Sequence, residues 1–156
     1  MSAELSEMFT DPISSLDPAA PISVELGTPV SEAIALMQEH RIGCLLVTQD
    51  GRLAGILTER DLMLKVAGRG VVLSTPVEEL MTPDPETLHP DHPVAYAINR
   101  MSLGGYRHVP LVNPKGAPMG VISVKDVVNH LVDHFPQDIY NLPPEPDVHP
   151  VSREGA

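Results

Sequence analysis

The chain has 156 residues, of which 42% are hydrophobic and 3% are aromatic, so its core must be aliphatic and suits one compact domain or two small ones. Its formal net charge is −11, and the first forty residues hold seven acids and no lysine or arginine. Such a surface repels phosphate backbones and anionic lipids, which argues against nucleic-acid and membrane partners.

The single cysteine, Cys44, excludes a disulfide framework and a cysteine zinc site. It begins an apolar stretch, so we expect it to pack as a small hydrophobe. The N-terminus is acidic and lacks the apolar stretch of a signal peptide, and no apolar run is long enough for a membrane span. We therefore expect a cytoplasmic protein.

After a leader with one short helix in residues 1–20, the chain repeats itself. Residues 21–24 match residues 85–88, and in both copies a second proline follows eight residues after the first. A helix is expected next in each copy, with Thr28 as the N-cap of the first one. Its apolar residues are spaced i, i+3, i+4, i+7 and are identical in the two copies: Val30, Ala33, Ile34 and Met37, then Val94, Ala97, Ile98 and Met101.

Each of these helices is followed by two apolar strands joined by a tight turn, and then by a closing helix. The strands are expected at 45–47, 54–57, 109–112 and 119–122, and the closing helices at 59–66 and 124–133. A short helix is expected at 77–81. Each copy therefore has the order strand, helix, strand, strand, helix.

A unit of about sixty residues buries too little surface to fold alone. We therefore expect the two units to pair, sheet against sheet. The closing helices carry further apolar residues that we expect to stay exposed after the two units pair, and burial of these residues against a second chain predicts a homodimer. They are Leu62, Met63, Val66, Val127, Val128, Leu131 and Val132.

Each copy closes with the motif Gly-apolar-apolar-Ser/Thr-x-Arg/Lys-Asp, at residues 55–61 and 120–126. The hydroxyl residue ends a strand and starts a helix, whose unpaired N–H groups and dipole suit a phosphate or polar ligand. The aspartate can accept two hydrogen bonds from a vicinal diol such as ribose. The same spacing is also a variant of the helix capping box, and a duplicated unit duplicates its caps, so both interpretations stay open.

The repeat resembles the CBS domain, and residues 14–134 resemble a CBS pair, or Bateman module. Residues 58–62 and 106–112 carry the resemblance, together with the helices that begin at Pro29 and Pro93. It implies an α/β (α+β) fold of two tandem βαββα units packed as a pseudo-twofold pair. The expected division is a leader (1–13), a first CBS domain (14–70), a second CBS domain (71–134) and a Pro-rich acidic tail (135–156).

The resemblance also implies a regulatory adenosyl ligand, namely AMP, ADP, ATP or S-adenosylmethionine, in the cleft between the domains, with no obligatory cofactor. The closing motifs would hold its ribose, and the residues entering each unit's first strand would line its adenine. The ligand-binding candidates are Ile22, Ser23, Thr58, Asp61, Thr87, Arg107, His108, Val109, Pro110, Ser123 and Asp126.

Two basic residues directly precede the strand expected at 109–112 in the second copy, and the first copy has no basic residues at the matching positions. Arg107 and His108 suit a phosphate group, whereas the matching residues of the first copy are Gly43 and Cys44. The alternative is that Arg107 caps an exposed edge and His108 bonds locally. We favour the phosphate role, which makes the two sites unequal. The basic residues of the closing motifs are expected to be solvated.

No catalytic motif is found in the sequence, so we expect no enzyme activity and no catalytic residues. His130 and His134, four residues apart on one helix, can bind zinc, but we favour a surface or interface pair and predict no metal site. The main hypothesis is a ligand-sensing module that signals to an unknown effector protein. The alternatives are a scaffold that dimerises and presents its acidic ends and tail, and, last, metal or redox sensing through the histidines and Cys44.

Overall fold

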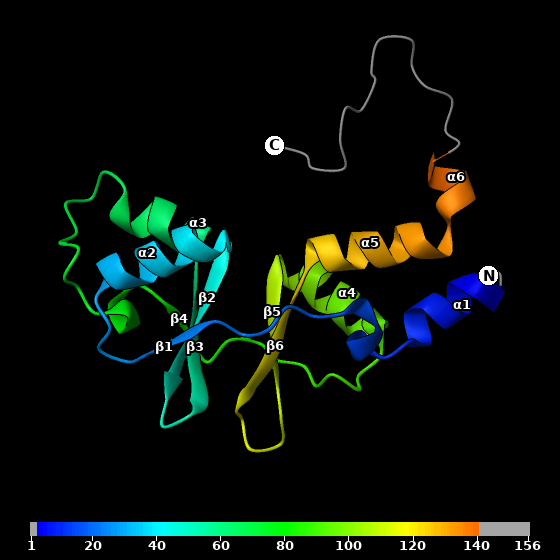
Figure 1. Cartoon of the computed structure of the whole chain (residues 1–156), viewed down its shortest axis with the longest axis horizontal. Helices are drawn as coiled ribbons and strands as arrows, with labels where there is room; N and C mark the ends of the chain where they lie inside the picture. Colours follow the sequence, from blue (N-terminus) through cyan, green and yellow to red (C-terminus); the bar gives the residue numbers. More distant parts are fainter. Residues whose placement is uncertain (1–2, 141–156) are drawn as a thin grey trace, which may run out of the picture.

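The structure is a computed structural model, and it describes residues 3–140. It contains two α/β units side by side, each with helices against a β-hairpin (Figure 1). The elements in chain order are α1 (Ala3–Thr10), η1 (Ile13–Leu16), β1 (Ser23–Glu25), α2 (Val30–His40), β2 (Cys44–Gln49), β3 (Arg52–Thr58), α3 (Glu59–Asp61), η2 (Leu62–Val66), η3 (Val77–Glu79), β4 (Thr82–Pro83), α4 (Val94–Gly104), β5 (His108–Val112), β6 (Pro118–Ser123), α5 (Val124–His134) and α6 (Pro136–Tyr140).

The first unit is built on a four-stranded sheet with the order β1-β2-β3-β4. β1 runs parallel to β2, and the other pairs are antiparallel. β2 is buried on both faces, as its unbroken apolar run indicates. Leu45 and Val47 pack into the core of the first unit, whereas Cys44 and Leu46 belong to a separate buried cluster on the other face.

The second unit is built on the β5–β6 hairpin, with α4 and α5 packed against each other. The strand expected before α4 is reduced to an isolated parallel bridge between Leu88 and Leu111. Prolines at positions 85 and 90 flank this segment and cannot donate to a ladder, which explains why the pairing stays so short.

The leader packs on the second unit, although the first unit follows it in sequence. Ile13 and Leu16 lie in the core of the second unit, and α1 contacts α4 and α5 (Figure 1). Conversely, Val77 and Leu80 lie in the core of the first unit, and β4 pairs with β3. The second unit is therefore completed by a segment distant in sequence, and the first unit by the segment that follows its closing helix.

The two units meet face to face across the sheets. Cys44, Leu46 and Ile56 of the first unit form a buried cluster against which Val121 of the second unit packs. At the far end of the hairpins, the Leu53 N–H donates to the Gly116 carbonyl across 2.9 Å. The predicted α/β fold of two tandem units packed sheet against sheet is therefore confirmed.

The predicted first closing helix at 59–66 is confirmed: it is α-helical over Glu59–Asp61 and continues as a π-helix over Leu62–Val66. The predicted N-cap of the first unit's earlier helix was wrong. Thr28 is not an N-cap, because its hydroxyl donates 2.7 Å to the Glu25 carbonyl in a turn, and extended Pro29 stands at the cap position.

The apolar residues of the closing helices divide into two groups. Leu62, Val66 and Val127 pack against the cores, so their expected exposure was wrong. Met63 and Leu131 are exposed, by 70% and 41%, as are Leu64 and Val128. Within residues 3–140, no helix combines the length and the apolar character needed to cross a bilayer.

Candidate ligand site

Both closing motifs form complete capping boxes. In the second unit, the Ser123 backbone N–H and hydroxyl donate to Asp126 Oδ2 across 2.7 and 2.6 Å, and the Asp126 N–H donates back to Ser123 Oγ across 3.3 Å. Thr58 and Asp61 make the same three contacts at 3.0, 2.8 and 3.3 Å. The capping interpretation is confirmed, and ribose binding stays a prediction.

The two aspartates differ in their second carboxylate oxygen. Asp61 Oδ1 lies 2.8 Å from Lys65 Nζ, which also donates to the Leu80 carbonyl across 2.6 Å. Asp126 accepts its side-chain hydrogen bonds through Oδ2. Within residues 3–140, its Oδ1 has no hydrogen-bond or ion-pair partner. The second aspartate therefore keeps an acceptor available for a ligand.

The candidate residues of the second unit gather at the open end of the β5–β6 hairpin. His108 pairs with Ser123 in the strand register, and the Val124 N–H donates to the Arg107 carbonyl across 3.0 Å. Arg107 is exposed. A carboxylate, a hydroxyl, an imidazole and a guanidinium thus lie around the N-terminus of α5.

His108 also reaches the first unit. A Cβ atom on Gly43 would lie 3.3 Å from His108 Cε1 and 3.4 Å from Glu59 Oε2, so the imidazole lies close against the backbone of the first unit and a side chain at position 43 would crowd it. Burial lowers the pKa of His108 below its ordinary value; the charges of Glu59 and Asp126 oppose this shift, and that of Arg107 adds to it. The imidazole is therefore neutral at pH 7 and lies at the boundary between the units.

Cys44, which matches His108 in the repeat, is 7% exposed. Burial raises the pKa of its thiol to about 12, and the charge of Glu59 adds to the shift. The protonated thiol is a poor nucleophile and a poor metal ligand. The prediction that Cys44 packs as a small hydrophobe is confirmed.

The residues predicted to line adenine lie beside the entry of each hairpin. The Leu46 N–H donates to the Ile22 carbonyl across 3.0 Å, and Ser23 pairs with Leu46. Thr87 is half-buried and precedes Leu88, whose N–H donates to a β5 carbonyl, that of residue 110, across 3.1 Å.

Two other candidates are fully buried. The Val109 side chain lies in the core of the second unit, and Pro110 is also inaccessible. In this conformation they hold β5 in place and present no side-chain surface to a ligand.

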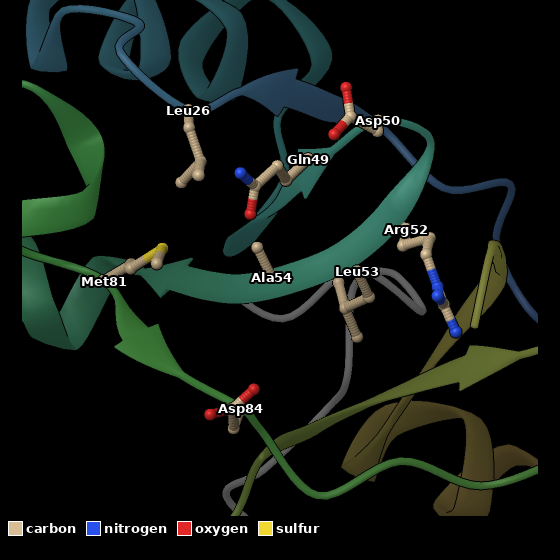
Figure 2. Close-up of a pocket in the computed structure, with 8 residues that line it drawn as sticks. All are labelled: Leu26, Gln49, Asp50, Arg52, Leu53, Ala54, Met81 and Asp84. Carbon is tan, nitrogen blue, oxygen red and sulfur yellow. The ribbon is translucent and has the colours of Figure 1, made fainter.

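Two hollows in the described chain are lined by no predicted site residue. Figure 2 shows one at the turn of the β2–β3 hairpin, with Arg52 directed toward the second unit's hairpin. Its lining is Leu26, Gln49, Asp50, Arg52, Leu53, Ala54, Met81 and Asp84. The other lies between α2 and the start of α3 and is lined by Ile34, Met37, Gln38, Arg41, Ile42, Glu59 and Leu62. Both hollows belong to the first unit.

Glu59 and Lys65 lie close to the candidate residues but were not predicted there, and one histidine lies elsewhere than on the surface. The i, i+4 spacing of Asp61 and Lys65 could have revealed their ion pair. His130 is not on the surface, because it is only 8% exposed and its Nε2 lies 3.3 Å from the Met8 carbonyl. Nothing in the sequence indicates that the leader covers it.

The repeat, the paired capping motifs and the face-to-face sheets define a tandem α/β module. The family model for the CBS domain matches residues 7–68 and 77–133, and the chain belongs to the CBS domain family. The predicted family and its tandem pair are therefore confirmed.

The relatives and solved structures agree with this family. A mitochondrial CBS domain-containing protein of Arabidopsis thaliana is 34% identical over 119 residues, which is 72% of this chain and 57% of the relative. The crystal structure of a CBS-domain protein from Agrobacterium tumefaciens is 32% identical, covers 76% of this chain and 96% of its own, and has a TM-score of 0.68. The chain spans about two thirds or less of the length of the curated relatives it matches first.

Several of the similar solved structures contain a ligand. A CBS domain protein from Pyrobaculum aerophilum complexed with AMP is 26% identical, covers 81% of this chain and 99% of its own, and has a TM-score of 0.72.

Proposed function

We propose that the chain is a regulatory module that binds an adenine nucleotide at the open end of the β5–β6 hairpin and passes its ligand state to a partner protein. The observation that carries the proposal is the uncommitted Oδ1 of Asp126, next to the Ser123 hydroxyl and the N-terminus of α5. The AMP complex of the Pyrobaculum aerophilum protein supports the ligand class.

Each group of the proposed site has a chemical task. Asp126 Oδ1 accepts hydrogen bonds from the ribose diol while Oδ2 keeps the cap. Arg107 offers a planar guanidinium to the phosphate, and His108 takes a proton when the anion arrives. The positive end of α5, a regular helix of 11 residues, adds to the attraction.

The position of His108 supports a route for the signal. Its ring contacts the Gly43 position and feels the charge of Glu59, both in the first unit. A phosphate that charges the imidazole changes the electrostatics at the unit boundary. It can shift the packing of the pair only by binding one arrangement more tightly than another.

We also propose that two copies associate through the exposed apolar residues of the closing helices, chiefly Met63 and Leu64 on η2 and Val128 and Leu131 on α5. Because the two helices occupy matching places in the repeat, a second chain related by a twofold axis meets the same kind of surface. Multi-angle light scattering should give a dimer, and Val128→Glu should give a monomer.

The test of the ligand is calorimetry and thermal melting of the full chain with AMP, ADP, ATP and S-adenosylmethionine. We expect a saturable heat and a raised Tm with at least one nucleotide, and weaker binding with a smaller rise in Tm in Asp126→Ala. Lys115→Ala, an exposed residue of the β5–β6 turn, is the surface control. No heat and no shift for any of the four at millimolar ligand would overturn the proposal.

A scaffold without a ligand is the second candidate, and the complete capping boxes favour it because they explain both motifs structurally. Under this alternative, Asp61→Ala and Asp126→Ala leave the cellular function intact, whereas deletion of residues 135–156 abolishes it. Residues 141–156 of this predicted tail lie outside the described chain.

A further inference from the structure

We propose that Asp11, His130 and His134 form a binding site for a divalent transition-metal ion such as Zn²⁺. One ligand atom from each residue lies within 4.8 Å of the other two. His130 is buried, and Asp11 of the leader and His134 at the end of α5 are partly buried. The site lies apart from the proposed nucleotide site and does not depend on it.

The hydrogen bonding of His134 indicates that a cation belongs between the side chains. Its Nδ1 lies 3.0 Å from the His130 carbonyl, an acceptor, so Nδ1 carries the proton. In the neutral ring, Nε2 is then unprotonated and can only accept a hydrogen bond. It lies 3.4 Å from Asp11 Oδ2, which as a carboxylate oxygen can also only accept one. Two acceptors face each other here, and a metal ion or a second proton must separate them.

The distances suit a metal ion. Asp11 Oδ2 lies 3.5 Å from His130 Nε2 and 3.4 Å from His134 Nε2. Ligand atoms of a tetrahedral zinc ion, with bonds of about 2.0–2.2 Å, lie roughly 3.3–3.6 Å apart. The backbone carbonyl that holds the far nitrogen of His134 is the outer partner that metal-bound histidines commonly have.

The i, i+4 spacing places both imidazoles on one face of α5, with ring centroids 4.3 Å apart. The leader supplies the carboxylate, and a fourth ligand would be the Met8 carbonyl oxygen, which lies 3.3 Å from His130 Nε2, or a water molecule. A bound ion would therefore fasten the end of α1 to α5. The leader already hydrogen-bonds α4 through the Asp11 carbonyl, which accepts from the Val94 N–H across 2.8 Å.

The experiment is a Co²⁺ titration of the tag-free full chain, followed by visible absorption, with displacement by Zn²⁺ measured by calorimetry. We expect one equivalent of Co²⁺ to give the intense bands of a tetrahedral site, Zn²⁺ to remove them, and Zn²⁺ to raise the Tm. His134→Gln and Asp11→Asn should each weaken binding by more than the roughly 10- to 100-fold that loss of an outer partner costs.

The matched control is His40→Gln, which changes an exposed histidine in the last turn of α2 and should bind like the wild type. Circular dichroism in EDTA verifies that each variant is folded. If the wild type gives no tetrahedral bands, or if His134→Gln binds as tightly as His40→Gln, the proposal is wrong and a proton occupies the gap instead.

Discussion

The two units carry the same closing motif but differ in what surrounds it. In the first unit, Lys65 forms an ion pair with the Asp61 oxygen that the cap does not use, and the helix changes from α to π geometry after three residues. In the second unit, Asp126 Oδ1 is free at the start of an 11-residue helix, with two basic residues beside it. Duplication preserved the cap in both units, whereas the features suited to an anion occur in one.

The largest expected effect is the loss of phosphate recognition in Arg107→Ala. A hydrogen bond to a charged group contributes about 1.5–3 kcal/mol, so AMP affinity should fall by about tenfold or more. Calorimetry with AMP and with adenosine separates the contribution of the phosphate from that of the nucleoside. Adenosine lacks the phosphate, so it should bind the wild type and Arg107→Ala with the same affinity. An equal loss for adenosine would show that Arg107 acts on the fold and not on the phosphate.

Arg60→Ala is the matched control, because Arg60 is the exposed basic residue within the closing motif of the first unit. It should leave AMP affinity unchanged. A loss equal to that of Arg107→Ala would remove the distinction between the units.

The next effect concerns stability, and here the two units should behave alike. Asp61→Ala and Asp126→Ala each remove a capping box, which costs about 1 kcal/mol of unfolding free energy. The Lys65 ion pair adds at most about 0.5 kcal/mol to the first loss, because it is partly exposed. Urea denaturation measures the unfolding free energy lost in each variant. A difference between the two losses well above about 0.5 kcal/mol would contradict the claim that the two caps are equivalent.

A smaller effect is the pH dependence that His108 gives to stability. Its pKa is lower in the folded protein than the ordinary value of 6.5, so the unfolded chain binds this proton more readily. The stability contributed by the neutral ring is complete above the unfolded pKa and is lost as pH falls through the folded pKa. His108→Gln should flatten this part of the urea-stability profile, and an unchanged slope would contradict the shift.

Nucleotide binding should reverse that shift, because a phosphate favours the charged imidazole. Binding should then take up a proton near pH 7, where a phosphate monoester with a pKa of about 6 is already mostly dianionic. Calorimetry in two buffers of different ionisation enthalpy measures the uptake. It should disappear in His108→Gln, and a persistent uptake would point to another group.

Much of this fold was predictable because it depends on local pattern. The repeated apolar spacing located α2 and α4, and the Ser/Thr-x-x-Asp spacing located the starts of α3 and α5. These signals arise within a few residues of each other, where helix periodicity and capping act.

The parts that could not be predicted depend on contacts between distant segments. The leader crosses to the second unit, so Asp11 meets His130 and His134 although more than a hundred residues separate them. His108 lies against the Gly43 position only because the hairpins face each other. No local periodicity encodes either contact.

The most direct test is a calorimetric comparison of AMP binding by the wild type, Asp61→Ala and Asp126→Ala. The two variants lose the same cap and differ in the fold only by the Lys65 ion pair, so a large difference between their AMP affinities reports the ligand and not the fold. If the second unit holds the preferred site, Asp126→Ala should lose about tenfold or more in affinity, and Asp61→Ala should retain the tightest binding step. Equal losses in the two variants, or a greater loss in Asp61→Ala, would contradict an unequal pair of sites.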